Sequence, residues 1–195
     1  MIIGITGGIG SGKSRVANSW ASFFDHPLLD LDILCRQLLD KEQPGWLALH
    51  KRFGVRFFDQ SGCLDRAAFR ATIFDDDSLR DEVNLLLHPL ARSCMRKRCR
   101  RLEGRTVLIE IPLLFEAGWQ QDVDRIVVVY ADTATRSNRI MARDGVSEQE
   151  CLRALGAQDS LEEKAMAADH VLDNSGQWVE TWLQIMHLGQ LYVER

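Results

Sequence analysis

The stretch Gly7–Ser14, with the sequence GGIGSGKS, holds the residues whose types and spacing specify chemistry most clearly. It fits the pattern G-x-x-x-x-G-K-[ST], in which the backbone N–H groups of a glycine-rich loop surround phosphate groups. Glycines adopt the backbone conformations that turn these N–H groups inward. Lys13 places a positive charge where the β- and γ-phosphates of a nucleotide lie, and the Ser14 hydroxyl can bind the accompanying Mg²⁺. The stretch therefore predicts a nucleoside triphosphate site.

The residues on both sides of this loop predict the strand and the helix that the motif requires. Residues 2–6 are typical of a short buried strand, and apolar residues at helical spacing follow over 14–24. The N-terminus of that helix would direct partial positive charge at the phosphates. A simple turn between two elements is the alternative, but it gives no reason for Lys13 and Ser14 at the end of the loop.

Two acidic residues at predicted strand ends are candidates for the remaining chemistry. Residues 26–30 predict a second strand with a helix directly after it, so Asp32 lies at a strand–helix junction. Ligands of open α/β sheets bind outside the carboxyl ends of the strands, which favours Asp32 facing the nucleotide. An N-cap role is the alternative. Glu110 ends an apolar strand over 106–110, where an acid near the metal and an ordinary strand-terminal carboxylate are both open interpretations.

Arginines on a later predicted helix suggest a lid. Arg136, Arg139 and Arg143 follow Thr133 at spacings of three and four residues, which places them on one helix face. A break at 144–145 and a capping box from Ser147 to Glu150 come next. Arginines beside such a hinge suit a lid that closes on a triphosphate. A solvated face paired with nearby aspartates is the alternative.

A run of basic residues between Arg92 and Arg105 has no single interpretation. Such a run is usually a solvated helix face, while a phosphorylated substrate or a nucleic acid would also suit it. Arg92 is the one candidate site residue in it, because it lies nearest the His88-Pro89 break.

The element pattern predicts an α/β fold. Strands over 2–6, 26–30, 106–110, 125–130 and 170–173, separated by helices, favour a five-stranded parallel sheet with helices on both faces. Residues 41–105 contain no convincing strand. Their helical segments begin at Pro44, near Arg66 and at Asp75, and we expect Pro89 to interrupt the last of them. A helix over 178–191 closes the chain, and no linker divides residues 1–195 into independent domains.

Composition limits the class of protein. The 195 residues are 46% hydrophobic and 27% charged with a net charge of −4, which is typical of a globular protein and argues against one that wraps nucleic acid. No apolar run reaches the length of a membrane span and no signal peptide precedes the first strand, so we expect a cytoplasmic protein. The five cysteines form no C-x-x-C pair and indicate reduced thiols without a structural metal.

The order of several short motifs resembles the dephospho-CoA kinase family over nearly the whole chain. The matching motifs are Gly4–Ser14, Leu29–Asp32 followed by Arg36, Phe53-Gly54, Gly62–Arg66, His88-Pro89, Pro112–Glu116, Arg139 with Arg143, and Ala168–Asn174. The resemblance implies ATP-dependent phosphorylation of the ribose 3′-hydroxyl of dephospho-CoA, which gives coenzyme A and ADP in the last step of coenzyme A biosynthesis.

The resemblance also implies an architecture and a set of site residues. The fold would be that of a P-loop NTPase, a three-layer αβα sandwich with strand order 2-3-1-4-5, a helical substrate lobe at about 35–105 and a lid at about 136–160. Asp32, Lys13 and Arg139 would be catalytic, with Mg²⁺ on Ser14. ATP would contact Gly8, Ile9, Gly10, Ser11, Gly12, Lys13, Ser14, Arg15, Arg139, Arg143 and Asn174. The acceptor would contact Asp32, Arg36, Arg66, His88, Arg92 and Leu113.

Four residues differ from the family pattern, and other functions remain as alternatives. Leu31, Cys35, Arg15 and Arg136 differ from the residues usual there, and Leu31 could tighten the cleft beside the acceptor ribose. Another P-loop small-molecule or nucleotide kinase with a different acceptor is the nearest rival. A regulatory GTPase is disfavoured, because residues 59–62 spell D-x-x-G after no buried strand and no N-K-x-D motif occurs. We expect ATP and dephospho-CoA as partners, no nucleic acid or membrane, and a monomer or weak homo-oligomer.

Overall fold

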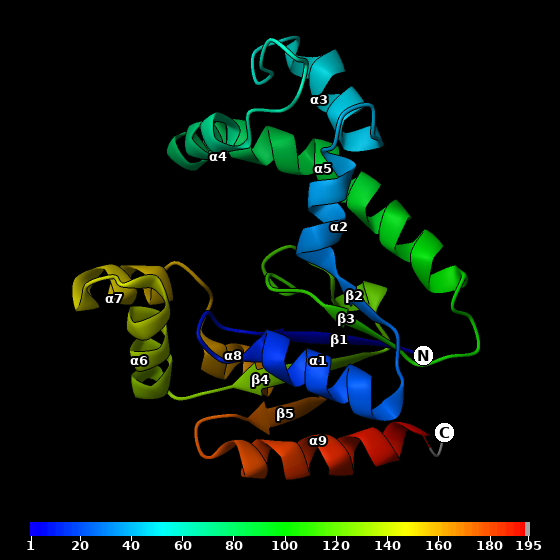
Figure 1. The fold of residues 1–195 in the computed structure, drawn as a ribbon, viewed down its shortest axis with the longest axis vertical. Helices are drawn as coiled ribbons and strands as arrows, with labels where there is room; N and C mark the ends of the chain where they lie inside the picture. Colours follow the sequence, from blue (N-terminus) through cyan, green and yellow to red (C-terminus); the bar gives the residue numbers. More distant parts are fainter. Residues whose placement is uncertain (194–195) are drawn as a thin grey trace. The chain divides into compact units, whose positions relative to one another are not determined.

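The structure, a computed structural model, describes residues 1–193 and contains two compact units (Figure 1). The first unit combines Met1–Asp30 with the chain from Leu102 onward, and the second is Leu31–Arg101. The first holds all the strands. Its elements are β1 (Ile2–Gly7), α1 (Lys13–Phe24), β2 (Leu28–Asp30), β3 (Val107–Glu110), a 3₁₀ turn (Gln120–Asp122), β4 (Arg125–Tyr130), α6 (Thr133–Asp144), α7 (Glu148–Gly156), α8 (Leu161–Met166), β5 (His170–Asp173) and α9 (Trp178–Val193).

The five strands form one parallel sheet in the order β2-β3-β1-β4-β5, which confirms the expected fold. Glu110 at the end of β3 pairs in register with Ile5 on one side and with Asp30 on the other. The carboxyl ends of three strands therefore meet at one edge of the sheet. The loop that follows β1 begins at this edge, where ligands of open α/β sheets bind.

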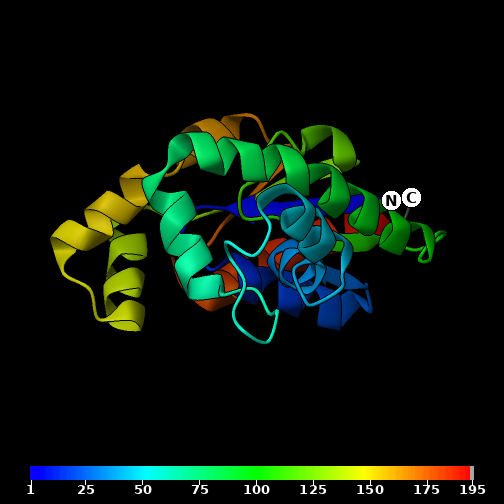
Figure 2. The same cartoon turned by 90° about the horizontal axis from the view of Figure 1, so that it is seen from above.

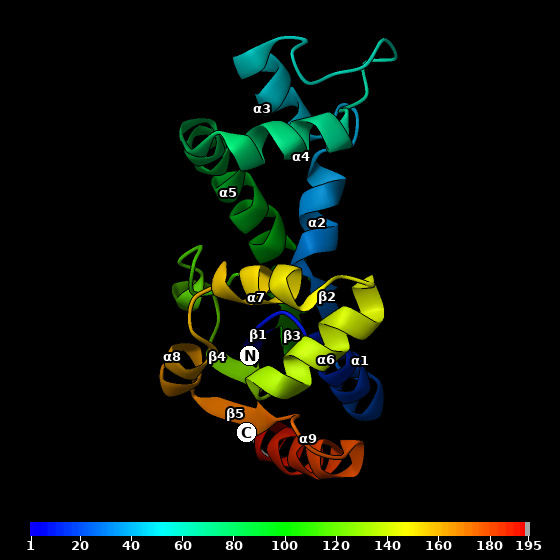
Figure 3. The same cartoon turned by 90° about the vertical axis from the view of Figure 1, so that its left-hand side faces the viewer.

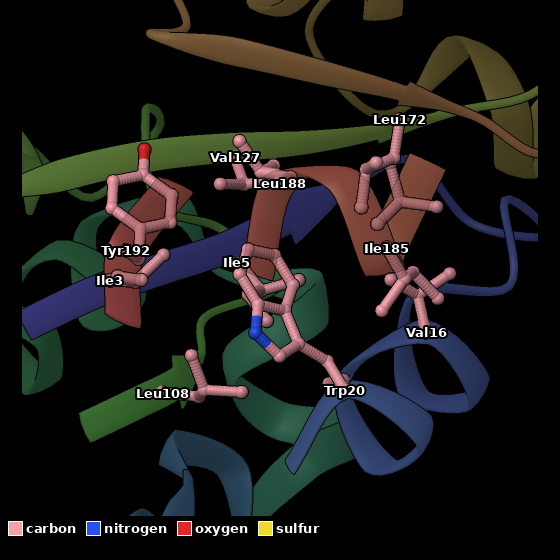
Figure 4. Packing of buried hydrophobic residues seen from close by; sticks show 12 residues of the cluster. Ile3, Ile5, Val16, Trp20, Leu108, Val127, Leu172, Ile185, Leu188 and Tyr192 are labelled. Carbon is pink, nitrogen blue, oxygen red and sulfur yellow. The ribbon is translucent and has the colours of Figure 1, made fainter. Parts of the chain in front are cut away.

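Helices cover both faces of the sheet. α1 and α9 pack on one face, and α8 lies on the other (Figures 2 and 3). Trp20 of α1 and Ile185 of α9 are fully buried against Ile5 of β1 (Figure 4). Because α1 and β1 share this core, the loop between them has two firmly held ends.

The second unit is helical, with α2 (Leu31–Leu38), α3 (Pro44–Phe53), α4 (Arg66–Asp75) and α5 (Asp77–Arg100). Its own core contains Leu49, Phe57, Phe69 and Val83. An isolated bridge between Phe58 and Leu64 is its one β-type pairing among the described residues, so the expectation of no strand over 41–105 is confirmed.

One expectation about the helices was wrong. Pro89 does not interrupt the helix that we placed before it, because α5 continues from Asp77 to Arg100 and only bends (Figure 1). Proline removes one backbone hydrogen bond and kinks a helix, and buried Val83 and Met95 on either side hold α5 in place. The helix α8 was not predicted from the sequence, although Ser160 caps it by accepting a hydrogen bond from the Glu163 amide at 3.3 Å.

Within residues 1–193, no helix is both long and apolar enough to cross a membrane.

Candidate functional site

The loop between β1 and α1 has the backbone of an anion-binding nest. Gly10 and Gly12 adopt φ values of 78° and 86°, a left-handed conformation that glycine tolerates best. A Cβ on Gly12 would stand 2.3 Å from Asn174 Nδ2, so no larger residue fits there. α1 begins at Lys13 without a side-chain cap, and its first N–H groups have no acceptor within the helix. These amides are placed to bind an anion.

Glu110 joins the two polar side chains at the end of the loop. Its Oε1 lies 2.9 Å from Lys13 Nζ and accepts a hydrogen bond from Ser14 Oγ at 2.6 Å. Glu110 as a residue is 5% exposed. The pairing of β1 with β3 delivers Glu110 to this place, since both strands end at the same edge. Of the two open interpretations, the contacts favour an acid that acts with Lys13 and Ser14.

Arg139 and Asn174 contact the same loop from elements far along the chain. Arg139 of α6 donates to the carbonyls of Gly10 and Ser11 at 3.4 Å and to that of Asn174 at 2.8 Å. Asn174, which is buried, donates from Nδ2 to the Ser11 carbonyl at 2.7 Å and accepts from Thr181 at 3.0 Å. The structure thus brings Arg139 to the loop, and both ends of the Asn174 amide support the shape of the loop.

The other arginines predicted at the nucleotide have different neighbours. The guanidinium of Arg15 stacks on the Trp178 ring, 3.7 Å from its centroid. Arg143 is exposed and bonds to Asp144 at 2.7 Å, which lowers the pKa of that carboxyl. Arg136, by contrast, packs so closely against Gly8 that a Cβ there would clash with its guanidinium. The one-face pattern of α6 therefore places two of its three arginines at the loop.

The second unit carries most of the residues expected at the acceptor. Asp32 is exposed and lies in the first turn of α2, one residue beyond its start, and not at an N-cap. Arg66 donates to the Arg36 carbonyl at 2.9 Å and to Asp40 at 2.8 Å.

His88 and Arg92 lie together on α5. They border a hollow of about 520 Å³ that is lined by Asp81, Asn84, Leu85, His88, Pro89 and Arg92. Burial lowers the pKa of His88, and the Arg92 charge adds to this effect. Leu113, the remaining expected acceptor contact, belongs to the first unit and is 48% exposed.

The sequence did not predict two long-range contacts, one of which reaches the loop. The Ile9 N–H donates to Oε1 of Gln158, which lies between α7 and α8, at 2.8 Å. Lys164 of α8 is buried and forms an ion pair with Glu116. Glu116 belongs to the motif Pro112–Glu116 that resembles the family, but no local sequence pattern predicts its ion pair with the distant Lys164.

A parallel sheet of this strand order, whose first strand ends in a phosphate-binding loop, defines the P-loop class of nucleotide-binding proteins. Within that class, the chain belongs to the dephospho-CoA kinase family, whose model matches residues 1–180.

Individual proteins are similar to this chain over most of its length. A dephospho-CoA kinase of Sodalis glossinidius is 38% identical over 192 residues, 98% of this chain and 92% of the relative. The crystal structure of TT1252 from Thermus thermophilus is 34% identical with a TM-score of 0.78, over 96% of this chain and 95% of that one. A dephospho-CoA kinase from Campylobacter jejuni, 22% identical, shares the fold with a TM-score of 0.73 over 97% of this chain and 95% of that one.

Proposed function

We propose that this chain is a dephospho-CoA kinase, which phosphorylates the ribose 3′-hydroxyl of dephospho-CoA with ATP and so completes coenzyme A. The observation that carries the proposal is the convergence of Lys13, Ser14 and Glu110 at a phosphate-binding loop, in a chain that matches this family over residues 1–180.

The proposed reaction is an in-line transfer. The 3′-oxygen of the acceptor forms a bond to the γ-phosphorus while the bond from that phosphorus to the β–γ bridging oxygen breaks, and ADP leaves. Asp32 accepts the hydroxyl proton or aligns the hydroxyl. Lys13 and the loop amides hold the β- and γ-phosphates, and Arg139 stabilises the charge on the γ-phosphate. Positioning and electrostatics supply most of such catalysis.

The residues beside the loop suit Mg²⁺. This ion prefers oxygen ligands, commonly one or two carboxylates together with substrate phosphates. The Ser14 hydroxyl and the Glu110 carboxylate, whose oxygens lie 2.6 Å apart, are oxygen ligands of this kind and would hold the ion. When bound, Mg²⁺ neutralises phosphate charge.

The proposal assigns roles to the remaining expected residues. The loop from Gly8 to Arg15, with Arg139, Arg143 and Asn174, forms the ATP site. Residues of about 35–105 act as a substrate lobe and those of about 136–160 as a lid. Asp32, Arg36, Arg66, His88, Arg92 and Leu113 bind the acceptor. The enzyme works in the cytoplasm as a monomer or weak homo-oligomer.

The decisive experiment compares acceptors. The purified protein is incubated with ATP and Mg²⁺ and offered dephospho-CoA, adenosine or AMP, and the phosphorylated products are separated and quantified. We expect turnover of dephospho-CoA well above that of the other two. Preference for adenosine or AMP would favour a different small-molecule kinase, and a parallel series with GTP determines the choice of donor.

A further inference from the structure

Gln158 is a side chain at the phosphate-binding loop that the mechanism above does not use. It lies in the segment between α7 and α8, and its Oε1 accepts a hydrogen bond from the Ile9 N–H at 2.8 Å. Its neighbours Ala157 and Asp159 are exposed, whereas Gln158 is half-buried. The side chain is therefore turned toward the loop while the residues beside it face solvent.

The element that follows Gln158 is firmly anchored. Leu161, the first residue of α8, is 2% exposed and lies near Gly8, the residue before Ile9. One turn later, the buried ammonium of Lys164 forms an ion pair with Glu116. A buried and paired charge is costly to pull apart, so α8 holds the preceding segment against the loop. The position of Gln158 is thus set by packing around it.

The orientation of the Gln158 amide follows from chemistry. A backbone N–H can only donate, so the atom that faces Ile9 must be the side-chain oxygen. The side-chain NH₂ group then points away from Ile9, and it has no acceptor among residues 1–193. Gln158 therefore accepts from the loop with one end and has two hydrogens to donate with the other.

The first half of the loop is the part that Gln158 contacts. The N-terminus of α1 follows at the other end of the loop and suits the inner phosphates, while Lys13 reaches the β- and γ-phosphates. Arg136 packs against Gly8 and adds positive charge beside the same half. A terminal phosphate would lie toward this side, where lid residues meet the loop.

We propose that Gln158 is a nucleotide-positioning residue: it holds the Ile9 amide through its oxygen and donates from its NH₂ group to the γ-phosphate of ATP. The inference rests on the proposed ATP site and adds a residue that distinguishes a triphosphate from a diphosphate. ADP lacks the group that Gln158 would contact.

The substitution Gln158→Glu separates the two functions of the amide. A carboxylate still accepts a hydrogen bond from Ile9, but it cannot donate and it repels phosphate. We expect Gln158→Glu to weaken binding of a non-hydrolysable ATP analogue by about 10- to 100-fold, the effect of losing a hydrogen bond to a charged group. Binding of ADP should change less than about threefold by the same reasoning. Titration calorimetry with Mg²⁺ measures both affinities.

Matched variants keep the test decisive. Gln190→Glu makes the same charge change at an exposed position of α9, outside the proposed lid, and should leave both affinities unaltered. Gln158→Ala removes both ends of the amide and should also weaken the analogue more than ADP. If either Gln158 variant weakens both nucleotides equally, Gln158 only anchors the loop and the proposal fails. Unchanged or tighter analogue binding also overturns it.

The acceptor plays no part in these titrations. A wrong assignment of dephospho-CoA would therefore appear in the acceptor assay alone, while a wrong role for Gln158 would appear in the ratio of the two affinities.

Discussion

Asp32 is the residue on which the proposed acceptor chemistry depends most directly. It is exposed in the first turn of α2. We expect Asp32→Asn to lower turnover by about 10²- to 10³-fold, as is typical when one preorganised catalytic group is removed. The affinity for an ATP analogue should stay near that of the wild type. Steady-state kinetics and titration calorimetry measure the two quantities, and turnover within a few-fold of the wild type would remove Asp32 from catalysis.

Replacing Arg139 should affect the use of ATP, because this residue contacts the phosphate-binding loop. Its three hydrogen bonds go to the Gly10, Ser11 and Asn174 carbonyls. We expect Arg139→Ala to raise the KM for ATP or lower kcat by about 10-fold or more, since bonds to charged groups are the stronger ones. The variant should still fold.

Arg153→Ala is a suitable control for that variant. Arg153 is exposed on α7, and its side chain donates to the Gln149 carbonyl at 3.4 Å. Wild-type kinetics in Arg139→Ala, or an equal loss in both variants, would contradict a specific role for Arg139 at the phosphates.

The site residues differ in how far local sequence predicts them. Lys13 and Ser14 are specified by a short motif whose flanking strand and helix can be recognised in one stretch. Glu110 meets Lys13 and Ser14 through the pairing of two strands about a hundred positions apart, so the sequence alone could not predict this contact. Gln158 reaches the loop through a segment without regular structure. Periodicity carries no information about such a contact, and nothing nearby predicted it.

At the scale of elements, the strands were the most predictable parts. The strands over 125–130 and 170–173 occur with the expected bounds. The first of them is an apolar, β-branched run that is buried on both faces. Pro89 shows the limit of a local rule. Proline disfavours a helix interior, yet tertiary packing on both sides of this position outweighs the lost hydrogen bond and α5 continues through it.

The cap of α6 gives an element-scale prediction about pH. Asp132 accepts hydrogen bonds from the Thr135 amide at 2.7 Å and its hydroxyl at 2.8 Å, which hold the pKa of Asp132 below the ordinary 3.8. A lowered folded-state pKa gives stability that is complete above the unfolded-state pKa and is lost as pH falls through the folded-state value. We expect Asp132→Asn to unfold at a lower temperature than the wild type at neutral pH, with the difference vanishing in strong acid.

Thermal unfolding followed by circular dichroism from about pH 2 to pH 7 covers the range in which this carboxyl titrates. Asparagine retains a capping side chain, so the comparison isolates the carboxylate charge. A difference in midpoint that stays constant with pH would show that this charge does not stabilise α6.

At the scale of the whole molecule, the two compact units divide the proposed chemistry. The unit of Met1–Asp30 with the chain from Leu102 onward contains the phosphate-binding loop and α6. The unit Leu31–Arg101 contains Asp32 and the hollow beside His88 and Arg92. Each has its own buried core, so ligands that bind one unit should leave a separate signature there.

Amide hydrogen exchange tests this division, because ligand binding slows local opening where the ligand contacts the chain. We expect an ATP analogue with Mg²⁺ to slow exchange over residues 7–14 and along α6 and the segment around Gln158. Dephospho-CoA without nucleotide should slow exchange mainly in α2 and α5. Adenosine, which lacks the diphosphate and the pantetheine arm, should protect α5 much less. Protection by dephospho-CoA confined to the unit of the phosphate-binding loop would show that Leu31–Arg101 is not the substrate lobe, because a ligand protects the backbone that it holds.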